Sequence, residues 1–360
     1  MSMSKRLLWL NGIAIIAVAA HHSAAYSLQA MFSWTDRYLP VTVPNYDQLG
    51  SFNYYVLMLI RLLLPFAGPA FFFISGYFVG VMAKGNRSTV SWSMVFSRIK
   101  LLLAPFLLWT AIRYILLRDI PRSIDDVLTP YHWIPLLIQF YLVAPFIIVM
   151  AKRNWKLLLI GIYLIGLLNS VLEYQATFGS GAALQIESYL PNWFFLVVLP
   201  FWFPFGVVIG LNLTQFKPYL IRYRWHLLAA TIVTAVLVLV EYAVVDQMTG
   251  PEWLGPGFGG LTKFPYSLFI ILTYLAFDKS QMPFANQIAD IGTKSLGIYL
   301  GNIPSVYVAS VLMYRFTPGL LGHQLIYFLI LLIVGIGVPL LLMEAVRRSA
   351  VRHRYRILFG

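Results

Sequence analysis

The stretch LIYFLILLIVGIGVPLLL, which occupies residues 325–342, decides the fold class of this chain. It contains no charged side chain, and its apolar residues do not alternate with polar ones. A strand of a membrane barrel is about ten residues long and alternates between the two, whereas a membrane-spanning helix needs about 20 mostly apolar residues in a row. The stretch therefore predicts a transmembrane helix, and with it an all-α membrane protein.

Composition extends this prediction to the whole chain. Of its 360 residues, 60% are hydrophobic and 11% are charged, whereas a soluble domain has about 45–50% apolar and about 25% charged residues. A single soluble core cannot bury such an excess of apolar side chains. Soluble globular and disordered proteins are both excluded. The absence of cysteine also excludes disulfides, thiolate metal sites and a cysteine nucleophile.

Stretches of about 20 apolar residues predict a bundle of about ten transmembrane helices. The first could instead be a signal peptide cleaved near the small residues at 23–25, but the polar groups within it favour a retained helix. No repeat of 20–50 residues is visible, which weighs against a transporter built from inverted repeats. The predicted spans are 7–27, 54–82 with kinks at Pro65 and Pro69, 100–117, 132–151, 156–172, 194–213, 226–246, 264–279, 288–312 and 324–345.

Basic residues orient these spans. The chain has 26 Lys and Arg against 13 Asp and Glu, a net charge of +13, which in a soluble protein would suggest nucleic-acid binding. Here most basic residues lie in short gaps between spans, and most of those gaps fall on the side of the two termini. The positive-inside rule then predicts cytoplasmic termini. Because these basic residues orient helices, no nucleic-acid partner is expected. Residues 1–346 are expected to form the transmembrane domain, and 347–360 a basic cytoplasmic tail.

Polar residues inside a span usually face a cavity or a partner, because the bilayer penalises them. The first span contains Asn11, His21 and His22. An eleven-residue step turns a helix through about 1100°, so Asn11 and His22 share a face about 16 Å apart, with His21 about 100° away. A histidine can take a proton from a hydroxyl at neutral pH. His22 is therefore a candidate general base; the alternative is an interfacial histidine satisfied by water.

Three further features have both a functional and a structural interpretation. Residues 65–77 combine aromatic residues with two prolines and two glycines, which indicates a kinked packing seam or part of a site. Arg61 either binds an anionic group through two parallel hydrogen bonds or extends to the interface. Arg98 either holds a phosphate at the inner face or anchors the topology. The six histidines lack metal-ligand spacing, and no nucleotide-binding glycine motif is present.

The order of these segments resembles the acyltransferase 3 family of integral-membrane O-acyltransferases. Five stretches are similar to family motifs: 10–22, which ends in His22; 69–77, with its Ser-Gly-Tyr end; 98–109, which begins with Arg98; 132–145, with His132, Trp133, Gln139, Tyr141 and Pro145; and 292–302, which ends in Asn302. No appended esterase-like domain is expected after the last span.

This resemblance implies transfer of an acetyl or other short acyl group from acyl-coenzyme A to a hydroxyl of a cell-envelope carbohydrate or glycolipid. The acyl-CoA is a substrate, and no bound cofactor or metal is implied. The expected location is the plasma membrane, with His22 as general base. Arg98 is a candidate contact for the donor phosphates, and the expected substrate-binding set is Arg61, Ser75, Tyr77, Arg98, Gln139, Tyr141 and Asn302.

Two positions depart from the family pattern. Asn11 stands where the family has an arginine, and Asn302 stands where it commonly has a histidine; both changes remove a positive or titratable group. Either the donor site has shifted, with Arg6 or Arg61 in the arginine's place, or the chain is a non-catalytic exporter of a polysaccharide or lipid-linked sugar. A polar tunnel that joins Arg98 to His22 would favour acyl transfer.

Overall fold

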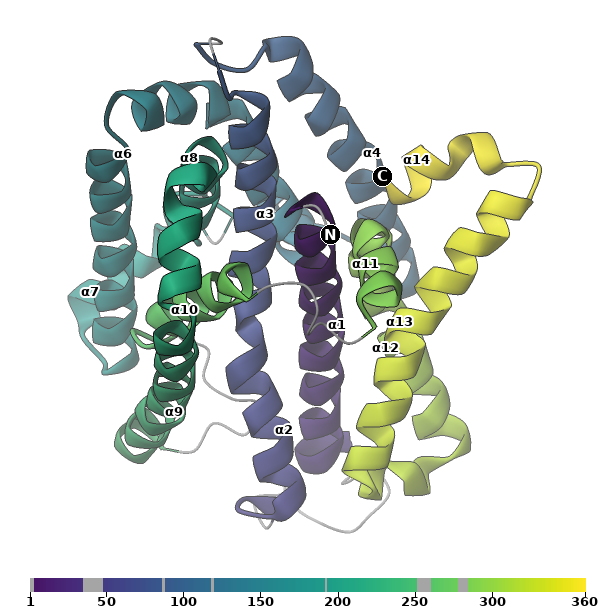
Figure 1. Ribbon diagram of the computed structural model, residues 1–360. Helices are drawn as coiled ribbons and strands as arrows, with labels where there is room; N and C mark the ends of the chain where they lie inside the picture. Colours follow the sequence, from purple (N-terminus) through teal and green to yellow (C-terminus); the bar gives the residue numbers. More distant parts are fainter. Residues whose placement is uncertain are drawn as a thin grey trace.

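The computed structural model describes residues 3–34, 48–85, 88–117, 120–191, 193–250, 260–277 and 284–360, and within these ranges every regular element is a helix (Figure 1). The all-α prediction is thereby confirmed for the described residues. The α-helices are α1 (Met3–Gln29), α2 (Phe52–Leu63), α3 (Ala67–Met82), α4 (Trp92–Leu117), α5 (Ile124–Leu128), α6 (Trp133–Thr177), α7 (Gly181–Ser188), α8 (Trp202–Arg222), α9 (Arg224–Thr249), α10 (Lys263–Ala276), α11 (Ala285–Thr293), α12 (Ser295–Phe316), α13 (Gln324–Arg348) and α14 (Tyr355–Phe359). Shorter π or 3₁₀ turns are η1 (Ala30–Trp34), η4 (Leu64–Phe66), η5 (Thr129–Tyr131), η7 (Pro318–Gly322) and η8 (Arg352–Arg354).

Among the described residues, 7 helical segments are long and apolar enough to cross a membrane. The predicted count of about ten spans is therefore not confirmed. The segments are Arg6–Phe32, Phe52–Met82, Trp92–Leu116, Trp133–Thr177, Arg224–Thr249, Ser295–Phe316 and Gln324–Arg348.

The differences from ten spans have local causes. The predicted spans 132–151 and 156–172 both lie in α6, whose backbone is non-helical at Asn154 (φ −158°, ψ 88°) and which bends at the top of Figure 1. The predicted span 194–213 is helical only from Trp202. For the predicted span 264–279, α10 has only 14 residues and ends at Ala276, and residues 278 and 279 lie outside the described ranges.

Kinks were predicted at Pro65 and Pro69, and the structure has one at Pro65, whereas Pro69 lies within α3. The chain forms the 3₁₀ turn η4 there, between α2 and α3. Proline lacks the N–H that would continue the α-helical hydrogen bonds, so a tighter turn at this point is expected. Pro69 lies in the first turn of α3, where proline is tolerated.

Helix α1 lies at the centre of the bundle, where it contacts α2, α3, α11, α12 and α13 (Figure 1). Its approach to α11 depends on two glycines. A Cβ atom on Gly12 would lie 2.0 Å from the carbonyl oxygen of Ile288, and one on Gly292 would lie 1.9 Å from that of Leu8. Backbone therefore packs directly on backbone, as small residues permit between membrane helices.

Four glycines form a second seam of this kind, between α3 and α8. A Cβ on Gly76 would lie 2.0 Å from the carbonyl oxygen of Phe203, and one on Gly206 would lie 2.1 Å from that of Phe73. One turn further along, Gly80 and Gly210 make similar approaches to the opposite backbone. These four residues are called the glycine seam below. The packing-seam interpretation therefore holds for the end of the stretch 65–77, where Gly76 and the carbonyl groups of Phe73 and Tyr77 take part in the seam.

Both ends of the short helix α10 are satisfied by charged side chains from other helices. At its start, the Glu241 carboxylate accepts hydrogen bonds from the backbone N–H groups of Leu261 (2.7 Å) and Thr262 (3.1 Å). At its end, the Arg6 guanidinium donates to the carbonyl groups of residues 274, 275 and 277. A helix end in a water-poor interior needs such partners, because its terminal backbone groups have none within the helix.

Removal of the Arg6 guanidinium is expected to destabilise the protein. Arg6 is 5% exposed, so Arg6→Met leaves buried carbonyls unpaired and should lower the free energy of unfolding by about 2–4 kcal/mol. Thermal unfolding of the purified protein in detergent measures the effect, with Arg347→Met, at an exposed position, as the matched control. Equal melting temperatures for the two variants would contradict the capping role.

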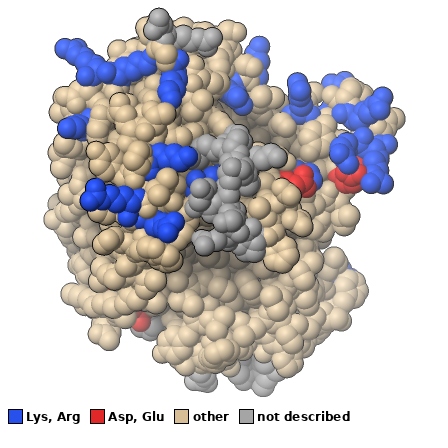
Figure 2. All heavy atoms as spheres, in the orientation of Figure 1, with Lys and Arg blue, Asp and Glu red and all other residues tan. Residues whose placement is uncertain are grey.

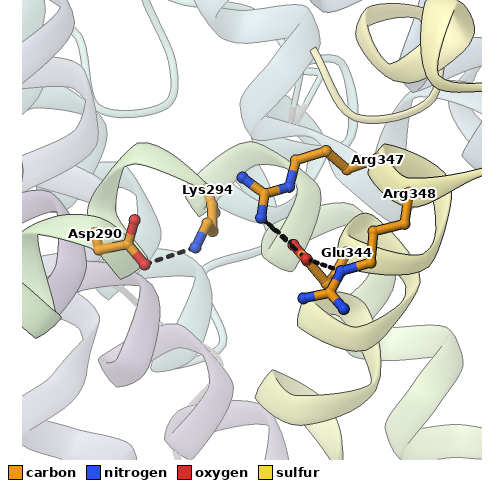
Figure 3. Close-up of polar contacts among 5 residues, drawn as sticks. All are labelled: Asp290, Lys294, Glu344, Arg347 and Arg348. Carbon is orange, nitrogen blue, oxygen red and sulfur yellow. Dashed lines mark hydrogen bonds and ion pairs between the residues drawn. The ribbon is translucent and has the colours of Figure 1, made fainter.

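On the face of the molecule drawn in Figure 2, most Lys and Arg side chains lie in one half. Figure 2 shows the Lys and Arg residues of this face in its upper half, the half in which both termini lie in Figure 1. The ion pairs found among the described residues lie in the last third of the chain (Figure 3). Lys294, between α11 and α12, pairs with Asp290, and Arg347 and Arg348 of α13 pair with Glu344.

The C-terminal segment, predicted to be a basic tail, returns to the bundle. The indole N–H of Trp109 in α4 donates to the carbonyl of Leu358 at 2.8 Å. Phe359 is 6% exposed and packs near Gly297 of α12. Its last helix, α14, is therefore part of the packed structure.

Candidate active site

His22 and Asn302 meet at the contact between α1 and α12. The Nδ1 atom of His22 lies 2.7 Å from Oδ1 of Asn302, whose Nδ2 donates to the carbonyl of Gly335 in α13 at 3.0 Å. A carbonyl only accepts hydrogen bonds, so the Asn302 amide presents its oxygen to His22. His22 must then carry its proton on Nδ1, which leaves the lone pair of Nε2 free to accept a proton.

Gly335 makes room for this arrangement. A Cβ atom there would lie 2.4 Å from Nδ2 of Asn302, so only glycine lets the backbone of α13 approach the amide. Asn302 is fully buried. Its two hydrogen bonds therefore hold the amide in one orientation, because a buried amide without partners is costly.

His21, one residue earlier, belongs to a different group of side chains. Its Nε2 accepts a hydrogen bond from Nη1 of Arg61 at 3.1 Å. The rings of His21 and His22 are edge to face, with their centroids 6.1 Å apart. His22 also lies within electrostatic range of Arg61 and His132. The first span thus presents two neighbouring imidazoles to two different helices.

A cavity of about 1230 Å³ opens beside His21 and Arg61. Two more charged residues line it, Glu173 from α6 and Lys263 from the start of α10, while most of the remaining lining is apolar. Neither Arg98 nor His22 is among the residues that line it, so this cavity is not the polar tunnel between them that would favour acyl transfer. Its other lining residues include Pro65, Gly68, Trp133, Leu159, Ile160, Asn169, Phe201 and Tyr266.

Three other predicted site residues come together on the side of α3 that faces α6. Ser75 is a hydrogen-bond partner of the Tyr141 hydroxyl, and Arg98 is close enough to Tyr141 to interact electrostatically with it. Arg98 itself is exposed. The resemblance implied that all three contact substrate, and the structure places them in one group.

Gln139 and Tyr77 have mainly structural surroundings. The Gln139 amide donates to the carbonyl of Trp193 at 2.5 Å and accepts from the N–H of Phe195 at 3.4 Å, so it holds the segment that leads into α8. Tyr77 is 4% exposed and lies in α3 beside the glycine seam, with its ring against Phe73 and Phe78.

Asn11, which occupies the position of the missing family arginine, and Arg6, one of its two possible substitutes, both make structural contacts. Asn11 donates to the carbonyl of Gly292 at 2.6 Å and to the hydroxyl of Ser295 at 2.8 Å, which ties α1 to the break between α11 and α12. Arg6 caps the end of α10. Neither contact involves the cavity, so of the two arginines considered as substitutes only Arg61 lines it.

Sequence reasoning missed Lys263 as a cavity residue, although it comes directly before the predicted span 264–279. A charged residue at the edge of an apolar run as short as 264–279 is a usable signal, because a helix too short to span must end inside the bundle. No group of residues that could hold a metal ion occurs in the described ranges.

Comparison with known proteins adds one finding. The sequence model of the acyltransferase 3 family, described as an acyltransferase domain, matches residues 6–344. No curated protein and no solved structure matches the sequence significantly.

Proposed function

The chain belongs to the acyltransferase 3 family, and from this premise we propose that it moves an acetyl or other short acyl group from acyl-coenzyme A to a hydroxyl of a cell-envelope carbohydrate or glycolipid. The proposed location is the plasma membrane. The gathering of basic residues at the end that holds both termini (Figure 2) supports cytoplasmic termini. The transporter alternative finds no support, because the matched model describes an acyltransferase domain.

The observation that carries the proposal is the pair His22 and Asn302. With its proton fixed on Nδ1, His22 accepts the proton of the acceptor hydroxyl on Nε2 while the hydroxyl oxygen attacks the thioester carbon. The carbon–sulfur bond then breaks, and the coenzyme A sulfur receives the proton from His22. Donor and acceptor held in line need no covalent enzyme intermediate, which suits a chain without cysteine.

Arg98, Ser75 and Tyr141 are the proposed contacts on the donor side. Arg98 lies near the start of α4, is exposed, and interacts with Tyr141. A guanidinium there is suited to the phosphates of coenzyme A. Asn11 does not replace the missing arginine in this account, because its hydrogen bonds to Gly292 and Ser295 are structural.

Label transfer tests the proposal. Purified wild-type protein is incubated with coenzyme A that carries a labelled acetyl group, and with an extract of envelope glycans and glycolipids. The proposal predicts release of free coenzyme A together with label in the glycan or glycolipid fraction. Absence of both, combined with no binding of coenzyme A in a direct titration, would contradict it.

Replacement of Asn302 tests whether this residue acts through His22. Asn302→Leu removes the acceptor for the Nδ1 proton and should lower the rate of transfer by about 10–100-fold, as loss of a partner that fixes an imidazole tautomer commonly does. Asn302→Asp still accepts that proton and should retain more activity. If both variants lose the same amount of activity at every pH, Asn302 has a purely structural role.

A further inference from the structure

Building on the proposed function, we infer that the acceptor is an anionic amphiphile, and that Arg61 and His21 bind its phosphate or carboxylate group in the cavity beside α10. The acceptor hydroxyl would then lie near His22. Acyl transfer by itself does not require an acceptor of this class.

The cavity has the size and lining for such a molecule. Its volume is about 1230 Å³, above the range of about 300–1,000 Å³ typical of small-molecule sites. Apolar side chains from α6 and from the segment before α8, such as Leu159, Ile160 and Phe201, form most of its wall. An apolar chain fits that wall, whereas a free sugar would leave it without contacts.

Arg61 supplies the positive charge. It lies in the last turn of α2, just before the turn at Pro65, and its Nη1 donates to Nε2 of His21. Because that nitrogen accepts the bond, His21 is neutral. The hydrogen bond therefore orients the guanidinium without adding a negative charge. A guanidinium held in this way at the wall of a mostly apolar cavity favours a planar or tetrahedral oxyanion.

His21 provides an independent indication. Since Nε2 accepts from Arg61, the His21 proton is on Nδ1, and this buried atom has no hydrogen-bond partner among the described residues. A buried donor without a partner is rare in a protein. Nδ1 is buried even with the cavity empty, so the His21 ring must turn for the oxygen of a bound anion to supply the missing acceptor.

The other two charged residues define the limits of the site. Lys263 interacts electrostatically with Arg61, but also with the carboxylates of Glu173 and Glu241. Glu241 already accepts the N–H groups at the start of α10. Glu173, by contrast, lines the cavity itself and opposes an anion there. Arg61 and His21 are therefore the principal contacts, and removal of Glu173 should strengthen binding.

Geometry connects this site with the proposed chemistry. The ring centroids of His21 and His22 are 6.1 Å apart. An anionic group bound at His21 would lie one residue from the proposed base, and the acceptor hydroxyl must extend beyond the cavity wall to reach His22, which does not line it. Such anchoring away from the reacting atoms is a common way to position a substrate.

Binding of matched probes tests the inference without any acyl donor. The full chain is placed in nanodiscs of zwitterionic lipid, with empty discs as background, and dissociation constants are measured for dodecyl glucuronide against dodecyl glucoside and for farnesyl phosphate against farnesol. The anionic member of at least one pair should bind about tenfold more tightly, the scale of one charge-assisted contact. A preference in the first pair alone identifies an acidic sugar, and one in the second alone identifies a lipid phosphate.

Variants locate the preference. Arg61→Gln should abolish it, Arg61→Lys should keep part of it, Glu173→Gln should increase it, and Arg347→Gln, which removes an exposed charge far along the chain, should leave it unchanged. No preference in either pair, or a preference that survives Arg61→Gln, would overturn the inference. If Arg61→Gln does not fold, Glu173→Gln decides: unchanged or weaker binding of the anionic probe overturns it.

The same probes separate this inference from the proposed function. His22→Ala should keep the anionic preference, because His22 does not line the cavity. A wild-type protein that prefers anionic probes but neither transfers label nor binds coenzyme A contradicts acyl transfer alone. One that transfers label but shows no such preference contradicts the anionic site alone.

Discussion

His22→Ala is expected to lower the rate of acyl transfer by about 10²–10⁴-fold, the usual contribution of a positioned general base. The loss follows from the Nε2 lone pair, which the hydrogen bond from Nδ1 to Asn302 keeps available. Alanine leaves the acceptor hydroxyl with no group to take its proton. The measurement is the initial rate of coenzyme A release with saturating donor and an envelope extract.

The companion variant His21→Ala separates a general effect on α1 from the role of His22. Both histidines lie in the same turn, but only His22 contacts Asn302. His21→Ala should weaken binding of the acceptor, seen as a raised KM, with a smaller change in kcat. Equal losses of kcat in the two variants would contradict the assignment of the base to His22.

Gly206→Val is expected to prevent normal folding. A Cβ at this position would lie 2.1 Å from the carbonyl oxygen of Phe73, so α3 and α8 must separate along the whole glycine seam. The backbone cannot move aside as a flexible side chain can. The substitution should therefore lower the free energy of unfolding by about 3 kcal/mol or more. Size-exclusion chromatography and thermal unfolding in detergent measure the folded fraction and its melting temperature.

Gly161→Val in α6 is the matched control, because an added Cβ there meets nothing within 4 Å. It should give a folded fraction and a melting temperature close to those of the wild type. The folded fraction and melting temperature of Gly206→Ala should fall between those of the two valine variants. A Gly206→Val protein as stable as the Gly161→Val protein would show that the two helices are not in direct backbone contact.

The fold class was predictable because it depends on local composition. An apolar run such as 325–342 can cross the bilayer only as a helix. The helices and the bend at Pro65 could therefore be predicted from short stretches of sequence. The number of membrane crossings could not be predicted from such stretches. A run such as 264–279 looks like a span, yet α10 ends at Ala276 with its terminal carbonyls bound by Arg6, a residue distant in sequence.

The candidate site was predictable only in part, and for a similar reason. His22 is conspicuous in sequence, because a histidine within an apolar helix is costly. Its partner Asn302 could be named only from the family resemblance, and the contact depends on Gly335 in a third helix. Helix geometry placed Asn11 and His22 on one face of the helix. It did not reveal that Asn11 forms hydrogen bonds with Gly292 and Ser295, where α11 ends and α12 begins.

The most direct measurement of the central claim is the transfer of labelled acetyl from coenzyme A to envelope glycolipid by wild type and His22→Ala, side by side at equal amounts of folded protein. The account predicts label in the acceptor fraction with the wild type, and at least about a hundredfold less with the variant. Label transfer at the same rate by both proteins would contradict the role of His22. Transfer by neither, with no binding of coenzyme A, would contradict the proposed activity.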